Sequence, residues 1–131
     1  MTQRHASRSC GELTATASSE PVRISICHCL ACQRRTGSAF GEQARFRSSD
    51  VVVEGRSKTW VRTADSGNRI TFHFCPSCGS TVFYWPDQEP DLTAIPVGAF
   101  ADSTFPAPKV SVYESRRHSW VAVPDEMEHH D

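Results

Sequence analysis

The segment Cys27-His28-Cys29-Leu30-Ala31-Cys32 organises this chain, because it places three sulfurs within six residues in the pattern C-x-C-x-x-C. A second pair follows at Cys75 and Cys78, and Cys10 precedes both motifs, which accounts for all six cysteines. Thiols this crowded suit convergence on a soft-ligand metal ion better than long-range disulfides. We therefore predict zinc ligands, and we call Cys27, Cys29 and Cys32 the cysteine triplet.

Composition narrows the class of protein further. The chain has 131 residues, of which 22% are charged and 38% apolar, as in an ordinary globular domain rather than a disordered chain. Its net charge of -1 argues against a nucleic-acid partner. No apolar run is long enough to span a bilayer, and the polar first ten residues do not resemble a secretory signal. We expect a soluble cytoplasmic protein, in which thiols stay reduced.

Short β-prone runs separated by Gly, Pro, Ser and Asp turn signals predict a mainly β fold. The expected strands cover residues 13–17, 22–26, 40–46, 51–53, 59–62, 69–74, 80–85, 92–100 and 109–113. One short helical segment is expected after the triplet, over 30–35, with Gly37 as its left-handed cap. We expect a single zinc-binding domain over 1–123 and a loosely held acidic tail over 124–131.

The spacing of the cysteines leaves two partitions open. Zinc prefers four tetrahedral ligands, and a C-x-x-C turn followed by a glycine, as in Cys75–Gly79, supplies half of such a site. That pair can join Cys10 while the triplet forms its own site, or it can join two sulfurs of the triplet. A triplet on its own leaves one zinc position open, as in a catalytic site, unless a distant fourth ligand closes it as a structural site.

Five segments, in order along the chain, carry a resemblance to a known family. They are Ser9-Cys10-Gly11, Cys27-His28-Cys29-Leu30-Ala31-Cys32-Gln33-Arg34-Arg35-Thr36-Gly37, Phe74-Cys75-Pro76-Ser77-Cys78-Gly79-Ser80, Gly98-Ala99-Phe100 and Arg117-His118-Ser119-Trp120. Together they resemble the glutathione-dependent formaldehyde-activating enzyme family, which also contains centromere protein V. The two cysteine motifs are specific, whereas the last two segments are weak alone.

The resemblance implies a fold, cofactors and an activity. The implied fold is an Mss4-like β-sheet sandwich, or β-tent, stapled by one or two zinc ions. The implied ligand sets are Cys10, Cys75 and Cys78 for a structural zinc, and Cys27, Cys29 and Cys32 for a zinc beside the substrate thiol. The implied reaction adds the thiol of glutathione to formaldehyde and is classed with the carbon–sulfur lyases.

One departure from the family pattern concerns the structural site. The family carries C-x-C-G near its N-terminus, but this chain has Arg8 in place of the first cysteine. A guanidinium stays protonated and cannot bind a metal ion, so we expect Arg8 to pair with a thiolate instead. A water, His5 or His73 would then have to complete this site. We expect this zinc to bind less tightly than in a four-cysteine relative.

Several residues around the triplet are candidates for catalysis or substrate binding. His28 is either a proton-transfer group or a side chain that only occupies the turn. Arg34 and Arg35 either bind the carboxylates of a glutathione-like thiol or form a solvated basic face. Gly37 and Ser38 either line a backbone wall beside the metal or form a helix cap and turn. The aromatic side chains expected in the core are Trp60, Phe72, Phe74, Phe83 and Tyr84.

Three functions are compatible with these features. The first is an enzyme that joins a small thiol, such as glutathione, to an aldehyde such as formaldehyde. The second is a non-catalytic, zinc-stabilised binding module, and the third is a thiol or metal sensor. A homodimer is compatible with the sequence, which does not set the oligomeric state.

Overall fold

A computed structural model describes residues 3–131. Its strands are β1 (Arg4–Ser7), β2 (Thr14–Ala17), β3 (Arg23–Cys27), β4 (Gly41–Arg47), β5 (Val51–Glu54), β6 (Lys58–Thr63), β7 (Arg69–Phe74), β8 (Thr81–Pro86), β9 (Leu92–Pro96), β10 (Val110–Val112) and β11 (Glu128–His129). One α-helix, α1, spans Leu30–Thr36, and short 3-10 turns cover Ser48–Asp50, Val97–Phe100 and Glu114–Arg116. The predicted mainly β architecture with one short helix is confirmed.

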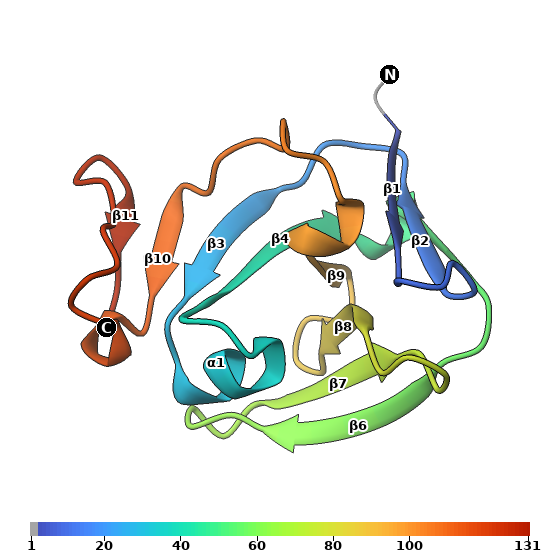
Figure 1. Cartoon of the computed structure of the whole chain (residues 1–131), viewed down its shortest axis with the longest axis horizontal. Coiled ribbons are helices and arrows are strands. Elements are labelled where there is room, and N and C mark those ends of the chain that lie inside the picture. The colour runs from blue at the N-terminus through green and yellow to red at the C-terminus, as the bar shows by residue number, and fades with distance from the viewer. Residues whose placement is uncertain (1–2) are drawn as a thin grey trace.

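The strands form two sheets. A small sheet has the order β1-β2-β5, and a large one has the order β11-β10-β3-β4-β9-β8-β7-β6. Neighbouring strands are antiparallel, except that β10 runs parallel to both β3 and β11. Figure 1 shows the large sheet curving around α1, with β3 and β4 on one side of the helix and β7 and β6 on the other.

A buried apolar core forms between the two sheets. The small sheet contributes alanines such as Ala15, and the large sheet contributes larger side chains such as Phe46 and Ile95. All three are fully buried. Alanines let the small sheet approach closely, so a few large side chains fill the space between the layers. This sandwich is the layer arrangement that the family resemblance implies.

Alternation along the large sheet sends every second residue to its opposite face. On β4, Ala44 and Phe46 enter the core, whereas Gln43 and Arg45 point to the other side. On β3, Ile24 enters the core and its neighbours face away from it. This second face of the sheet carries the candidate site, and α1 lies over part of it.

Two terminal strands were not expected from the sequence. β1 arises from the polar segment at the N-terminus, where pairing with β2 outweighs weak strand propensity. The segment 124–131, expected as a loose tail, instead contributes β11, which pairs with β10. Met127 is buried there, and the His130 N–H donates to the Ser111 carbonyl over 2.8 Å. Tertiary contacts at the edge of the large sheet therefore order this acidic segment.

Within residues 3–131, no helix combines the length and the apolar character needed to cross a membrane.

Candidate functional site

The cysteine triplet forms where β3 passes into α1. Cys27 is the last residue of β3, Cys29 is the N-cap of α1, and Cys32 lies in the first turn of the helix. The Cys32 N–H donates to the Cys29 sulfur over 3.3 Å, so the helix start itself orients one sulfur. Gly37 ends the helix with a left-handed φ of 65°, as the sequence predicts.

The three sulfurs converge. All lie within 4.8 Å of one another, whereas sulfurs bound to one tetrahedral zinc are about 3.8 Å apart, given Zn–S bonds of about 2.3 Å. A small closure would bring them to ligand distance, and soft thiolates suit zinc. The donor set and its spacing therefore fit a single zinc ion held by this chain.

The sulfurs also share their charge unevenly. Hydrogen bonds from the Cys27 and Cys32 thiols lower the pKa of Cys29. The hydrogen bond to Cys29 raises the pKa of Cys27, and burial adds to this rise. For Cys32, the contact with Cys27 lowers the pKa, but the contact with Cys29 and burial raise it overall. Cys29 is therefore the sulfur that holds negative charge most readily, and a bound cation would favour the thiolate form of all three.

A glycine lets the helix approach the sheet closely enough to assemble the triplet. Gly41, the first residue of β4, lies opposite Cys27 in the register. A Cβ on Gly41 would come within 3.2 Å of both Cys32 Cβ and Arg35 Nη2. The missing side chain therefore leaves room for Cys32 and Arg35 beside β4.

The triplet lines a cavity of about 370 Å³ on the second face of the large sheet. This volume is in the range of small-molecule sites. Aromatic side chains from β7 and β8, Phe72 and Tyr84, form part of the wall. Five arginines also line the cavity, namely Arg23, Arg35, Arg45, Arg62 and Arg116, against two carboxylates, Asp65 and Glu89. The cavity is therefore apolar on one wall and strongly cationic around it.

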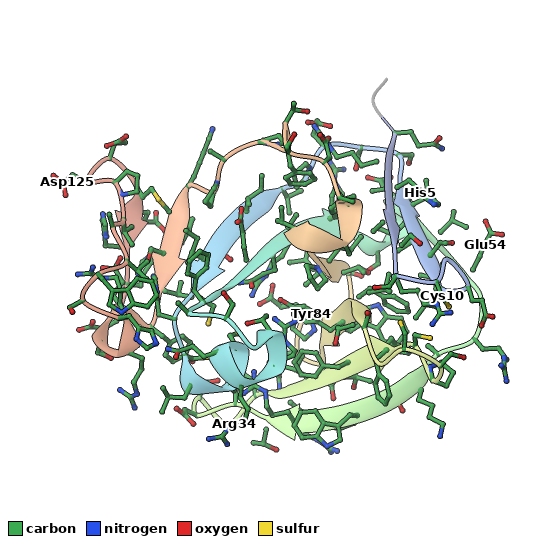
Figure 2. All side chains as sticks on the ribbon, viewed as in Figure 1. His5, Cys10, Arg34, Glu54, Tyr84 and Asp125 are labelled. Atoms are coloured by element: carbon green, nitrogen blue, oxygen red, sulfur yellow. The ribbon has the colours of Figure 1, made fainter. Side chains whose placement is uncertain are left out.

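Of the residues predicted to bind substrate, the structure brings Arg35 to the cavity. Its guanidinium lies over the rings of Tyr84 and Phe72, 5.4 and 5.5 Å from their centroids. Arg34, Gly37 and Ser38 are exposed and do not line the cavity. Figure 2 shows Arg34 beside α1 at the outer surface of the molecule.

His28 is placed away from the cavity. It follows Cys27, so its side chain leaves on the opposite side of the chain, and it is fully buried. Its Nε2 lies 2.9 Å from the Ser111 hydroxyl of β10, and burial lowers its pKa. The contact with Ser111 joins the segment after β3 to β10, and His28 is not among the described residues that line the cavity. Its role in proton transfer stays a prediction.

The cysteines of the second predicted zinc site are arranged differently from those of the triplet. Within residues 3–131, the cysteines that converge as a metal-binding group are those of the triplet, and Cys10, Cys75 and Cys78 do not form such a group. The fully buried side chain of Arg8 approaches the C-x-x-C turn instead, and its Nη1 donates to the Cys78 sulfur over 3.3 Å. A protonated guanidinium beside this sulfur does not fit a zinc ion at the same place. The expected pairing of Arg8 with a cysteine sulfur is confirmed.

The two histidines proposed to complete that site each make one hydrogen bond through Nδ1, and the Nε2 of His73 has no partner among the described residues. His5 Nδ1 lies 2.9 Å from the Thr16 hydroxyl, and His73 Nδ1 lies 3.0 Å from the Ser57 hydroxyl. The Cys75 sulfur accepts from two backbone N–H groups, those of Ser77 and Cys78. The turn is therefore held by hydrogen bonds.

The sequence analysis missed several cavity residues and misplaced others. Arg23 and Arg45 were not singled out, although alternation from Cys27 back along β3 places Arg23 on the triplet's face. Phe72 and Tyr84 are buried in a core cluster, as expected, and they also line the cavity, which was not expected. Trp60, also expected in the core, is 56% exposed because it lies on β6 at the sheet edge.

Comparison with known proteins agrees with this geometry. The family model for the glutathione-dependent formaldehyde-activating enzyme matches residues 3–116. A search among curated proteins gives no match. The fold is similar to a crystal structure of a Rhodobacter sphaeroides protein, with a TM-score of 0.52 and 20% identity, covering 72% of this chain and 85% of that one. The chain therefore belongs to the glutathione-dependent formaldehyde-activating enzyme family.

Proposed function

We propose that this protein joins a small thiol to an aldehyde at the cysteine triplet, in the manner of a zinc-dependent carbon–sulfur lyase running in the direction of synthesis. The observation that carries the proposal is that all three sulfurs line the cavity. A purely structural zinc site is normally closed by four protein ligands, whereas three ligands beside a cavity leave room for an exchangeable group. Family membership supports formaldehyde and glutathione as the first pair to test.

Cys27, Cys29 and Cys32 would hold the zinc ion. When bound, the ion would lower the pKa of the substrate thiol and so supply a thiolate at neutral pH. The thiol sulfur then attacks the carbonyl carbon, and a carbon–sulfur bond forms as the C=O π electrons move to the oxygen. The proton lost by the thiol ends on that oxygen, which gives a hemithioacetal.

Arg35 is suited to stabilise the developing charge on the aldehyde oxygen. Its Nη2 is buried and has no hydrogen-bond partner among the described residues. The position is close to the triplet, because a Cβ on Gly41 would touch both Nη2 and Cys32. A fixed donor aimed at an oxygen that gains charge lowers the barrier more than one that must reorganise.

Arg62 offsets the negative charge of the sulfurs from the other side. It comes from β6, lines the cavity, and lies 5.6 Å from the Phe72 ring centroid. Its positive charge is among the influences that lower the pKa of Cys29, after the hydrogen bonds within the triplet. Cations on both sides of three thiolates favour the charged state that a metal ion requires.

The test is exchange between ¹³C-formaldehyde and glutathione, followed by NMR with zinc-loaded protein. We expect exchange faster than the spontaneous reaction, and we expect Cys32→Ser to abolish the acceleration. Cys10→Ser is the matched control, because Cys10 is exposed and lies outside the triplet. An exchange rate that the protein leaves at its spontaneous value would overturn the proposal for this substrate pair.

A further inference from the structure

Two arginines face each other directly across the strands that carry the triplet. Arg23 on β3 is the register partner of Arg45 on β4, and both line the cavity. The next cavity-facing pair is Ser25 and Gln43, and Cys27 opposite Gly41 follows. A straight ladder therefore runs along one face from the arginine pair to the triplet.

Neither arginine of the pair forms an ion pair in the described part of the chain, although the charge of Arg23 is among the weaker influences that lower the pKa of Glu128. Within residues 3–131, no carboxylate lies within ion-pair distance of either guanidinium. The Nε atoms of Arg23 and Arg45 are both buried and have no hydrogen-bond partner. Like charges directly opposite each other destabilise an antiparallel pair, and buried donors without partners add to that cost. An arrangement of this kind is stabilised when an anion binds between the two side chains.

A third unsatisfied group lies between the pair and the triplet. Gln43 is buried, and its Nε2 donates to the Ser25 hydroxyl over 2.8 Å, which fixes the orientation of the amide. Its Oε1 is buried and accepts no hydrogen bond from the described residues. The cavity thus offers one acceptor midway along the ladder, suited to an N–H donor.

We propose that Arg23 and Arg45 form an anion clamp that binds a terminal oxyanion of the thiol substrate, while Gln43 Oε1 accepts from an N–H group in the middle of the same molecule. This inference rests on the proposed function, because it assigns the far end of the substrate whose thiol lies at the triplet. The substrate class is an extended thiol with an amide near its centre and a carboxylate or phosphate at its end.

The dimensions of the ladder set the length of that molecule. Arg23 and Cys27 are four residues apart on β3, which is about 13 Å along an extended strand. Arginine side chains reach part of this distance, so the ligand spans somewhat less. Paired guanidinium groups match the two oxygens of a carboxylate, or those of a phosphate, through charge-assisted hydrogen bonds.

Binding of S-methylglutathione by calorimetry tests the clamp separately from chemistry, because this probe has no free thiol. We expect Arg23→Gln and Arg45→Gln each to weaken binding at least about tenfold, as for the loss of a hydrogen bond between charged groups. Arg47→Gln is the matched control, since Arg47 lies on β4 but is exposed and outside the cavity. Removal of one like charge should leave the Tm of either clamp variant equal to that of wild type or higher.

Two further probes test the clamp by changing the anionic group of the ligand instead of the protein. The dimethyl ester of S-methylglutathione lacks carboxylates, and equal binding of ester and acid would overturn the clamp. The second probe, S-methyl-4′-phosphopantetheine, carries its oxyanion as a phosphate. If it binds more tightly than S-methylglutathione, and if Arg23→Gln weakens this binding, the clamp is supported and its natural ligand bears a phosphate. If the clamp variants bind the acid like wild type, the inference is wrong even where the exchange reaction is accelerated. Clamp-dependent binding without acceleration would instead refute only the proposed chemistry.

Discussion

Arg8 Nη1 donates a hydrogen bond to the sulfur of Cys78 over 3.3 Å, from a side chain that is fully buried. Its Nη2 lies 3.4 Å from the Glu12 carboxylate, at ion-pair distance but without hydrogen-bond geometry. A hydrogen bond with Ser80, together with this guanidinium, lowers the pKa of Cys78 to about 7. The positive charge of arginine thus lies beside a sulfur that the family pattern would give to a metal ion.

Arg8→Cys is therefore expected to create a second metal site. The substitution removes the buried cation and restores the C-x-C-G pattern, which gives four sulfurs with Cys10, Cys75 and Cys78. We expect the zinc content of the purified protein to rise from about one to about two ions per chain, as measured by inductively coupled plasma mass spectrometry. Arg8→Ser is the control, because it removes the guanidinium without adding a sulfur. Equal zinc in the two variants would contradict the interpretation.

Metal removal should destabilise the protein through the triplet alone. A ligand that binds only the folded state stabilises that state by its binding free energy, and zinc is such a ligand here. A strong chelator that removes the zinc should therefore lower the Tm of the zinc-loaded protein. Cys32→Ser should bind little zinc, and its Tm should be insensitive to the chelator. Differential scanning fluorimetry with and without chelator measures both, and Cys10→Ser is expected to behave like wild type. A chelator effect that persists in Cys32→Ser would place the metal elsewhere.

Gly55 is expected to tolerate no side chain. It follows β5 with a φ of +101°, and a Cβ would lie 1.8 Å from the Glu12 carbonyl oxygen in the β1–β2 turn. Gly55→Ala should therefore lower the free energy of unfolding by more than about 2 kcal/mol, measured by urea denaturation. Gly67→Ala is the matched control, because Gly67 has a φ of +91° with open space around it. Its cost should be about 1 kcal/mol, from the backbone alone.

The docking of β11 is expected to weaken as the pH rises. His129 Nδ1 lies 2.7 Å from the Glu114 carboxylate, and this contact raises the pKa of His129 above its ordinary 6.5. A hydrogen bond from Ser111, followed by that from His129, lowers the pKa of Glu114 below its ordinary 4.5. Because the pKa of His129 is raised, its contact with Glu114 stabilises the folded state fully below about pH 6.5, and this stabilisation is lost as the pH rises through the pKa of the folded state. Because the pKa of Glu114 is lowered, the same contact stabilises the folded state fully above about pH 4.5, and this stabilisation is lost as the pH falls through the pKa of the folded state.

The contact is thus strongest between about pH 4.5 and 6.5 and fades toward alkaline pH. Hydrogen exchange of the Glu128 and His130 amides, corrected for the intrinsic rate at each pH, should show protection that falls several-fold toward about pH 8. Both amides are bonded to the β10 region in the folded state. Glu114→Gln should remove this pH dependence, and protection that stays constant in wild type would refute the coupling.

The features of the protein that rest on short-range geometry could be predicted from the amino-acid sequence. Alternation and flanking turn residues located β3 and β7, and the spacing of the triplet placed three sulfurs around one helix start. Gly37 marked the end of α1, because few other residues adopt a positive φ at that position. Each of these depends on residues within a few positions of one another, so local sequence is enough to specify them.

The set of distant residues that share the cavity could not be predicted in this way, because it depends on how the strands are arranged in the folded chain. The pairing of Arg23 with Arg45 depends on the register of β3 and β4, and the arrival of Arg62 depends on how the large sheet curves around α1. The same holds for the acidic C-terminal segment, which has no apolar periodicity yet pairs with β10. A period-two pattern gives the face on which a side chain lies, whereas the partner across the sheet follows from strand order and register, which are set by the packing of the whole core.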